Sequence, residues 1–447
     1  ERNQTISLAS RPTHMQLSAN GRHLVVSSPQ LGQGSASGVS VFEYQNDVWE
    51  LKGETHLYGD LTLTDLSMSG DGNRIAVALG DRTRTQVQVL DWDGSTWQEQ
   101  TLLARVGSAL EAGAPVDLSG DGNTLLIGNP LQGSHLQQGD RKGVADIYRL
   151  YDNSWRLYGT VSGTYGGDYF GSEVATSEDG NIASVFAIGG LRFTSYHSPY
   201  GMNYGAGYVD TYDLNSGVMG SRISGDERNE RFGQTIDLAN LGQTLLTFSY
   251  SANPMQVMVS DFTNGTWIAR GQPLNPGDGT TASFFSDAAI TEDGQRVAIF
   301  RAGNSETTPS VPTLAIFDWV DSSWRMTTSV DDPQADQSTA SFHLSTDGSV
   351  VAISSQNEVR TFDLTQPREY KINLNDRSSV NESLKILDEM ATLISDERAK
   401  IAAGVSRLKY VALGQDSGIL AHEAALAGIE DADFAAESAV LAKTQVL

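Results

Sequence analysis

Residue types that support acid, base or metal chemistry are dispersed along this chain. No two of the seven histidines have the i, i+4 spacing of helical metal ligands, and cysteine is absent. Most aspartates lie in short glycine-containing loops, where an aspartate accepts hydrogen bonds from backbone amides. Because catalysis needs a convergent set of acids, bases or nucleophiles, we predict no enzyme active site, no cofactor and no metal ligands. Surface or packing roles are expected for His14, His23, His56, His135, His197, His343 and His422.

One insertion, residues 191–208 (LRFTSYHSPYGMNYGAGY), concentrates aromatic side chains on a glycine-rich loop. Exposed aromatic faces can stack on a sugar or another surface ligand, which makes this loop a candidate glycan-binding site. The alternative is a long loop that folds over the domain surface with its tyrosines half-buried. The candidate binding residues are Phe193, Tyr196, Tyr200 and Tyr204, followed by Tyr208 at the end of the loop.

The charge balance excludes polyanionic partners. With 30 basic and 55 acidic residues the net charge is -25, which disfavours nucleic acid and anionic membranes. The sequence has no apolar run of about 18 residues, the length needed for a membrane span. Residues 1–10 lack the basic and apolar regions of a secretory signal. We therefore expect export by another route, or the loss of an N-terminal segment from this chain.

An internal repeat provides the elements that must position these residues. A phrase close to Leu-Ser-Gly-Asp-Gly-Asn, followed by apolar residues, occurs seven times at intervals of 51, 50, 58, 62, 52 and 54 residues. An Asp-Gly or Asn-Gly pair between two β-prone runs predicts a tight hairpin turn with positive φ angles. The shared glycines are Gly21, Gly72, Gly122, Gly180, Gly242, Gly294 and Gly348.

Two further strands complete most of the repeated units. An alternating strand such as residues 87–92 (VQVLDW) is followed by a polar turn and a tryptophan. We predict four strands per unit, and a seven-bladed β-propeller from the seven units. The tryptophans are expected to pack between blades rather than to form a ligand cage. They are Trp49, Trp97, Trp155, Trp267 and Trp324.

The two ends of the repeat region complement each other. The last unit, residues 341–374, has no tryptophan strand, whereas residues 3–10 (NQTISLAS) form a strand without a hairpin partner. Pairing of these segments would close the ring and remove an exposed sheet edge. We therefore place the propeller at residues 1–375. The predicted fold class is mainly β with an α-helical tail.

The repeats resemble those of the FG-GAP or integrin-type propeller family. Phe170-Gly171 and Phe232-Gly233 precede the repeated phrase in the fourth and fifth units, as a phenylalanine-glycine pair does in that family. Blades of that family often hold calcium on loops of the form Asp-x-Asp-x-Asp-Gly. The loops here read Ser-Gly-Asp-Gly or Ser-Glu-Asp-Gly, so the calcium function is not carried over.

After Pro367 the sequence pattern becomes helical. Within residues 376–429 apolar residues recur at alternating steps of four and three, which predicts one long amphipathic helix with a coiled-coil seam. Such a stripe needs a partner helix, and the sequence offers no second helical segment. The seam residues expected to act in assembly are Leu384, Leu387, Ile394, Ile401, Val405, Leu408, Ile419, Leu426 and Ile429.

This tail resembles the C-terminal conserved region of bacterial flagellin. The resemblance lies in residues 383–408 (SLKILDEMATLISDERAKIAAGVSRL) and 429–447 (IEDADFAAESAVLAKTQVL). It implies that residues 376–429 form a filament-core helix and that residues 430–447 are the truncated start of an inner helix. The matching motif residues are Glu430, Asp431, Asp433, Phe434, Lys443 and Gln445.

The flagellin resemblance implies a structural subunit of the bacterial flagellar filament, outside the cell, with the propeller displayed on the filament surface. Its partners would be other flagellin subunits and the N-terminal flagellin helices, which are absent before Glu1. One alternative is an adhesive or glycan-binding propeller that the tail anchors to a filament. Another alternative is a hook-filament junction protein, because such proteins have similar terminal regions. The sequence of residues 430–435 (EDADFA) favours flagellin.

The glycan-binding hypothesis for the aromatic loop has a direct test. If the loop binds glycans, substitution of Tyr200 and Tyr204 removes the stacking surface and abolishes binding of residues 1–375 to a glycan array. Unchanged adhesion after both substitutions would show that the loop only covers the domain surface.

Overall fold

The computed structural model describes residues 4–8, 10–28, 37–59, 61–80, 85–102, 114–132, 141–189, 206–225, 232–249, 256–274, 286–301, 313–331, 341–365 and 437–444. The chain divides into two compact units, Glu1–Gln366 and Pro367–Leu447. The first unit is built from antiparallel sheets, each centred on one copy of the repeated phrase.

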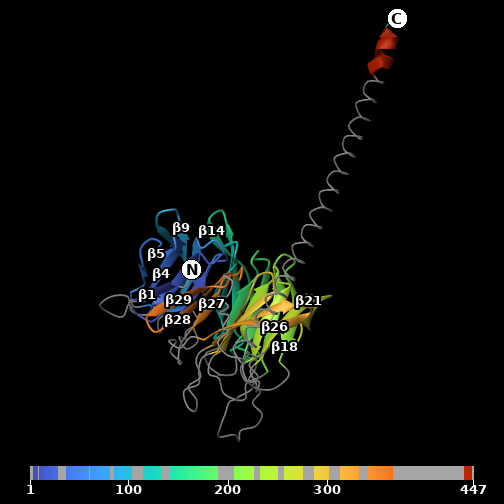
Figure 1. Ribbon diagram of the computed structural model, residues 1–447. Helices are drawn as coiled ribbons and strands as arrows, with labels where there is room; N and C mark the ends of the chain where they lie inside the picture. The colour runs from blue at the N-terminus through green and yellow to red at the C-terminus, as the bar shows by residue number, and fades with distance from the viewer. Residues whose placement is uncertain are drawn as a thin grey trace, which may run out of the picture. The chain divides into compact units, whose positions relative to one another are not determined.

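Seven sheets form a seven-bladed propeller, as the repeat predicts (Figure 1). The first strands of adjacent blades contact each other around the axis, so they are the innermost strands. Blade 1 contains β2 (Met15–Leu17), β3 (His23–Ser28), β4 (Gly38–Gln45) and β5 (Val48–Leu51), with β6 (His56–Leu57) paired to β4. Blade 2 contains β7 (Thr62–Met68), β8 (Arg74–Gly80), β9 (Thr85–Trp92) and β10 (Trp97–Leu102). Blade 3 contains β11 (Val116–Leu118), β12 (Thr124–Asn129), β13 (Val144–Tyr151) and β14 (Ser154–Ser162).

The remaining blades repeat this order. Blade 4 contains β15 (Glu173–Thr176), β16 (Ile182–Ala187), β17 (Tyr208–Asp213) and β18 (Val218–Ser224); blade 5 contains β19 (Phe232–Ala239), β20 (Thr244–Ser249), β21 (Gln256–Thr263) and β22 (Thr266–Ala269); blade 6 contains β23 (Ser286–Ile290), β24 (Arg296–Arg301), β25 (Thr313–Val320) and β26 (Ser323–Asp331); blade 7 contains β27 (Phe342–Leu344), β28 (Val350–Ser355), β29 (Glu358–Asp363) and β1 (Gln4–Ser7).

The ring closes as the sequence predicts, because the first strand of the chain completes the last blade. β1 pairs antiparallel with β29, and Ile6 lies opposite Val359. In Figure 1 the blue β1 lies beside the orange β29. Ile6 is buried in a cluster that also includes Met15 and Val350, so this strand joins blade 7 to the core shared with blade 1.

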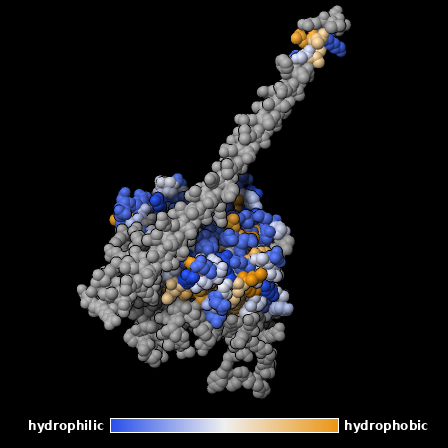
Figure 2. All heavy atoms as spheres, turned by 45° about the vertical axis from the view of Figure 1, so that its right-hand side comes forward, coloured by the Kyte–Doolittle hydropathy of each residue, from blue (hydrophilic) through white to orange (hydrophobic). Residues whose placement is uncertain are grey.

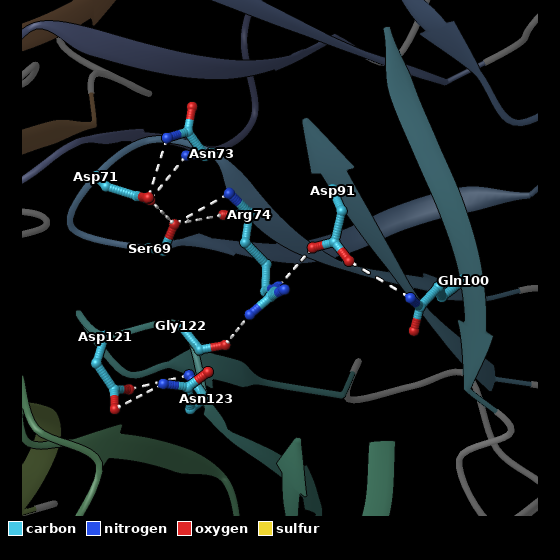
Figure 3. A network of polar contacts seen from close by, with 9 residues as sticks. All are labelled: Ser69, Asp71, Asn73, Arg74, Asp91, Gln100, Asp121, Gly122 and Asn123. Carbon is cyan, nitrogen blue, oxygen red and sulfur yellow. Dashed lines mark hydrogen bonds and ion pairs between the residues drawn. The ribbon is translucent and has the colours of Figure 1, made fainter. Parts of the chain in front are cut away.

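Each repeated phrase forms a hairpin loop in which the shared glycine has the predicted positive φ. In blade 2 the loop between β7 and β8 has five residues, and the positive φ is that of Gly72, at 71°. Asp71 Oδ1 accepts hydrogen bonds from the Ser69 hydroxyl at 2.6 Å and from Asn73 N at 3.0 Å (Figure 3). This side-chain network stabilises the five-residue loop, and the predicted backbone-binding role of the aspartate is confirmed.

The tryptophans pack between blades, as predicted. Trp97 of blade 2 packs against the core cluster between blades 1 and 2, and its indole Nε1 donates to Lys52 O at 2.9 Å. Trp324 of blade 6 donates in the same way to Arg270 O at 2.9 Å. Each of these two indoles therefore adds apolar area and one hydrogen bond to a blade junction.

Within the second unit the structure describes residues 437–444, an α-helix whose side chains are all exposed. The predicted long helix at residues 376–429 lies outside the described residues, and the boundaries at residues 375 and 429 stay predictions. No helix in the described part of the chain is long and apolar enough to cross a membrane.

The closing strand should contribute measurably to stability. Ile6→Ala removes a buried side chain from the junction of blades 7 and 1 and should lower the free energy of unfolding by about 2–4 kcal/mol. The neighbouring exposed Thr5 provides the control, since Thr5→Ala should change it by less than about 0.5 kcal/mol. Urea denaturation measures both; equal small effects would contradict a structural role for β1.

Candidate functional site

Within the described residues, the innermost strand of every blade has one edge without a strand partner. Backbone N–H groups on such an edge need an acceptor from elsewhere. The side chain immediately before the repeated hydrophobic residue supplies it by reaching from one blade to the next. Gln16 Oε1 accepts a hydrogen bond from Met68 N at 2.7 Å, and Asp117 Oδ2 accepts one from Thr176 N at 2.7 Å.

We call this side-chain-to-backbone contact the inner tie. Ser67 Oγ accepts from Leu118 N at 3.0 Å, which joins blades 2 and 3. Asp237 Oδ2 accepts from Ile290 N at 2.9 Å, which joins blades 5 and 6. The acceptor always lies on one blade and the donor on the next blade along the chain.

The last inner tie joins the seventh blade to the first. His343 Nδ1 accepts from Leu17 N at 3.2 Å and so joins blade 7 to blade 1. Ala175 and Ala289 stand at the corresponding positions of blades 4 and 6. An alanine side chain has no acceptor, so the inner tie is absent after these two blades.

Five carboxyl groups, here called the axial carboxylates, lie on the innermost strands. Each keeps partial solvent access, yet the ring of strands encloses it closely. Burial raises the pKa of three of them to about 7 and of a fourth to about 6, although backbone amides donate to these carboxylates. Burial also raises the pKa of the fifth, Glu173, and repulsion from carboxylates of blades 2, 3 and 6 adds to that rise. The axial carboxylates are Asp65, Asp117, Glu173, Asp237 and Asp287.

Two histidines share this environment. Burial lowers the pKa of His14 and of His343 to about 4. The neutral imidazole is the form in which a ring nitrogen accepts a hydrogen bond, as His343 does from Leu17 N. The enclosed centre of the ring therefore shifts both carboxyl groups and imidazoles toward their neutral forms relative to water.

This arrangement can bind protons near neutral pH and join blades. In the described ranges, no group of three or more histidine, aspartate or glutamate side chains is placed to hold a metal ion. The chemistry that the axial carboxylates support is thus a change of protonation coupled to the stability of the ring.

Most residues that the sequence singles out fall outside the described ranges. This holds for the four candidate glycan-binding aromatics, for the assembly seam and for the flagellin-like motif apart from Lys443. Lys443 is exposed on the helix at residues 437–444. Their roles stay predictions.

Tyr208, expected on the aromatic loop, is instead the first residue of β17 and is buried. Its hydroxyl donates to Asp168 Oδ2 at 2.7 Å, and the guanidinium of Arg222 lies 3.9 Å from its ring centroid. Arg222 also pairs with Asp210 at 2.6 Å. A ligand-stacking role for Tyr208 is wrong because protein groups occupy its hydroxyl and its ring face.

Our sequence analysis missed the axial carboxylates and the inner ties. The signal for them is the residue immediately before the repeated hydrophobic position, which is polar in five of the seven copies. A polar residue at this position is unexpected in a strand enclosed by other strands unless it has a partner. The residues at this position are Gln16, Ser67, Asp117, Ala175, Asp237, Ala289 and His343.

No protein-family model matches the chain. Two curated proteins are similar to a short part of it. The flagellin of Listeria innocua is 38% identical over 72 residues, and the flagellin of Listeria monocytogenes is 36% identical over 72 residues. Each match covers 16% of this chain and 25% of the flagellin, so the chain spans about a quarter of the length of the curated relatives that it matches.

Several solved structures resemble the propeller in fold. Hydrazine synthase of Kuenenia stuttgartiensis matches with a TM-score of 0.52 and 14% identity, over 80% of this chain and 97% of that chain. The β-propeller domain of Cps50 (Swd1) of Myceliophteria thermophila matches with a TM-score of 0.52 and 10% identity, over 81% of this chain and 100% of that chain. Similarity at these identities concerns the fold alone and transfers no activity.

The stability of the propeller should fall as the pH rises from about 5.5 to about 8. The folded pKa of each axial carboxylate lies above its ordinary value, so the folded state binds more protons than the unfolded state in this range, and raising the pH favours unfolding. The lowered pKa values of His14 and His343 make stability rise with pH below pH 6.5. Because these two groups oppose five axial carboxylates, we expect the carboxylates to determine the direction of the change. Asp237→Asn keeps an acceptor for Ile290 N and should reduce the pH dependence of the urea midpoint.

Asp93→Asn is the matched control for this measurement. Asp93 is exposed, and hydrogen bonds from the amides of Thr96 and Ser95 hold its pKa below the ordinary range, so it is ionised throughout the interval. Its substitution should leave the slope of the midpoint against pH unchanged. If both variants reduced the slope equally, the axial carboxylates would not be its source.

Proposed function

We propose that this chain is a structural subunit of a bacterial flagellar filament that displays a β-propeller on the filament surface. The observation that carries the proposal is the similarity to two flagellins over 72 residues. The sequence of residues 376–447 resembles the C-terminal region of flagellin. In this proposal residues 376–429 form the filament-core helix, residues 430–447 begin the inner helix, and the protein is extracellular.

The described helix at residues 437–444 supports an assembly role. Val440 is 57% exposed and Leu441 is 60% exposed on its surface. Apolar side chains on a helix gain stability by packing against a partner helix. We propose that other flagellin subunits and N-terminal flagellin helices supply that partner.

The propeller has a surface suited to display in water. The chain carries a net charge of -25, which keeps copies dispersed except where specific contacts form. The described propeller residues in Figure 2 are mainly hydrophilic, with small separate hydrophobic areas. Large exposed apolar side chains are scattered over several blades, for example Leu51 in blade 1, Ile268 in blade 5 and Met326 in blade 6.

Filament incorporation tests the proposal. The C-terminal part of a host flagellin is replaced by this chain, so that the host supplies the N-terminal helices, and filaments are examined with immunogold-labelled antibody to the propeller. We expect labelled filaments, and no label after deletion of residues 376–447. Equal labelling of the deletion variant would overturn the assembly role of the tail.

A point substitution refines this test. Leu441→Asp places a charge on an apolar helix position and should reduce labelling at least about tenfold, because a buried unpaired charge is costly. Ser438→Asp introduces the same charge at an exposed polar position of the same helix and should change labelling by less than about twofold. Equal loss in both variants would indicate a general effect of charge on the helix.

A further inference from the structure

Besides the inner tie, a second contact joins adjacent blades at their hairpin loops; we call it the loop tie. The backbone N of Ala19 donates to Gly70 O at 2.9 Å, and Gly70 N donates to Gly120 O at 2.9 Å. A loop tie is present at six of the seven junctions. The others run from Asp121 N to Glu178 O, from Asn240 N to Glu292 O, from Glu292 N to Thr346 O and from Asp347 N to Ala19 O.

A third contact, the glycine tie, reaches the carbonyl of the shared glycine in the next loop. Arg74 Nη1 donates to Gly122 O at 2.6 Å, while its Nε pairs with Asp91 in the same blade (Figure 3). Glycine ties are present at five junctions. The others run from Lys52 to Gly72 at 3.1 Å, from Thr124 to Gly180 at 3.0 Å, from Arg270 to Gly294 at 2.5 Å and from Arg296 to Gly348 at 3.0 Å.

The junction between blades 4 and 5, the 4/5 seam, lacks all three ties in its described strands and loops. Ala175 offers no acceptor for an inner tie, and the two loops share no backbone hydrogen bond. Ile182 takes the place that Arg74 has in blade 2, and its side chain lies against Gly242. Every other junction keeps at least two of the three ties.

The hairpin loops of blades 4 and 6, on either side of blade 5, each carry a half-buried glutamate. Burial raises the pKa of Glu178, in the loop of blade 4, and the charge of Asp121 adds to the rise. Burial also raises the pKa of Glu292, in the loop of blade 6, with repulsion from Glu178 and Asp179 adding to it. The carboxyl group of Glu178 lies against Gly70 and Gly120 of blades 2 and 3, whereas Glu292 Oε1 accepts a hydrogen bond from Leu241 N of blade 5 at 2.8 Å. Neither glutamate therefore supplies a contact between blades 4 and 5.

In the described residues, apolar packing holds the seam, together with one polar contact at its other end. Phe186, Val209 and Phe232 belong to the core cluster that blades 4 and 5 share. Phe232 N donates to Ala206 O at 3.1 Å, at the end of β19 away from the hairpin loop. The next residue, Gly233, has a φ of 86°, and a Cβ there would lie 2.6 Å from the Val209 side chain.

We propose that the ring opens locally at the 4/5 seam, starting at the hairpin loops and pivoting on Phe232-Gly233, while the other six junctions stay closed. The polar ties that fix the loops of the other blades are missing here, and the contact at the start of β19 is kept. A directional hydrogen bond resists separation at short range, whereas apolar packing alone permits larger excursions. The phenylalanine-glycine pair of blade 5 is then a hinge. This inference does not depend on the flagellin proposal.

Native-state hydrogen exchange of the full chain, read by mass spectrometry, tests the opening. The amides of β19 that face blade 4 should exchange at least about tenfold faster than the amides of β11 that face blade 2, where all three ties are present. Ala175→Gln copies the acceptor of Gln16 without adding charge and should slow exchange at the seam about three- to tenfold.

Ala289→Gln is the matched control, since the junction of blades 6 and 7 lacks the inner tie but keeps the two others. It should change exchange at the 4/5 seam by less than about twofold. Equal exchange at the 4/5 seam and at the junction of blades 2 and 3 in the unmodified chain would overturn the proposal, whether or not the variants fold. An equal effect of the two glutamine variants on the seam would overturn it as well.

Discussion

Seven bare strand edges meet at the centre of this ring, and the rest of the propeller depends on how their amides are satisfied. Among the described strands, none pairs with an innermost strand on its axial side. A side chain of the neighbouring blade provides the acceptor instead. Asp117 and Asp237, for example, accept hydrogen bonds from backbone amides of the next blade at 2.7 Å and 2.9 Å. The same side chains bring charge into an enclosed place, which raises their pKa to about 7. Cohesion of the blades and sensitivity to protons therefore have one origin.

Most blade junctions are held by more than one kind of polar contact, but the number of kinds differs from junction to junction. Three kinds of polar contact recur at the junctions, so that the loss of one, as after Ala289, leaves others in place. Between blades 4 and 5 alanine and isoleucine replace the polar residues, and the large apolar side chains of the shared core take over. Hydrogen bonds fix a distance and a direction, whereas apolar contact is proportional to area and indifferent to direction. Two blade junctions with similar strand arrangements can therefore differ in how strongly they resist separation.

The sequence was sufficient to predict the blades because their determinants are local. A glycine with positive φ, alternating strands and a tryptophan define each unit, and the strand at residues 3–10 needs the partner that the last blade lacks. The axial carboxylates escaped prediction because their partners lie about one repeat away. Asp117 is matched to an amide of blade 4, and its role is visible once adjacent innermost strands are placed side by side. The positive φ of the shared glycine was predictable from the Asp-Gly pair, whereas the five-residue length of the loop was not, because it depends on the side chains of Ser69 and Asp71.

The pairing of the first and last strands has a consequence for how such a domain is carried by a longer chain. Gln4, at the beginning of β1, lies opposite Thr361, and β29 ends two residues later at Asp363. The polypeptide therefore arrives and departs at the same end of one sheet, through neighbouring strands. The two ends of the ring are therefore as close together as the two ends of a β-hairpin. A host protein can join such a domain to two adjacent positions of a surface loop without a change in its own fold.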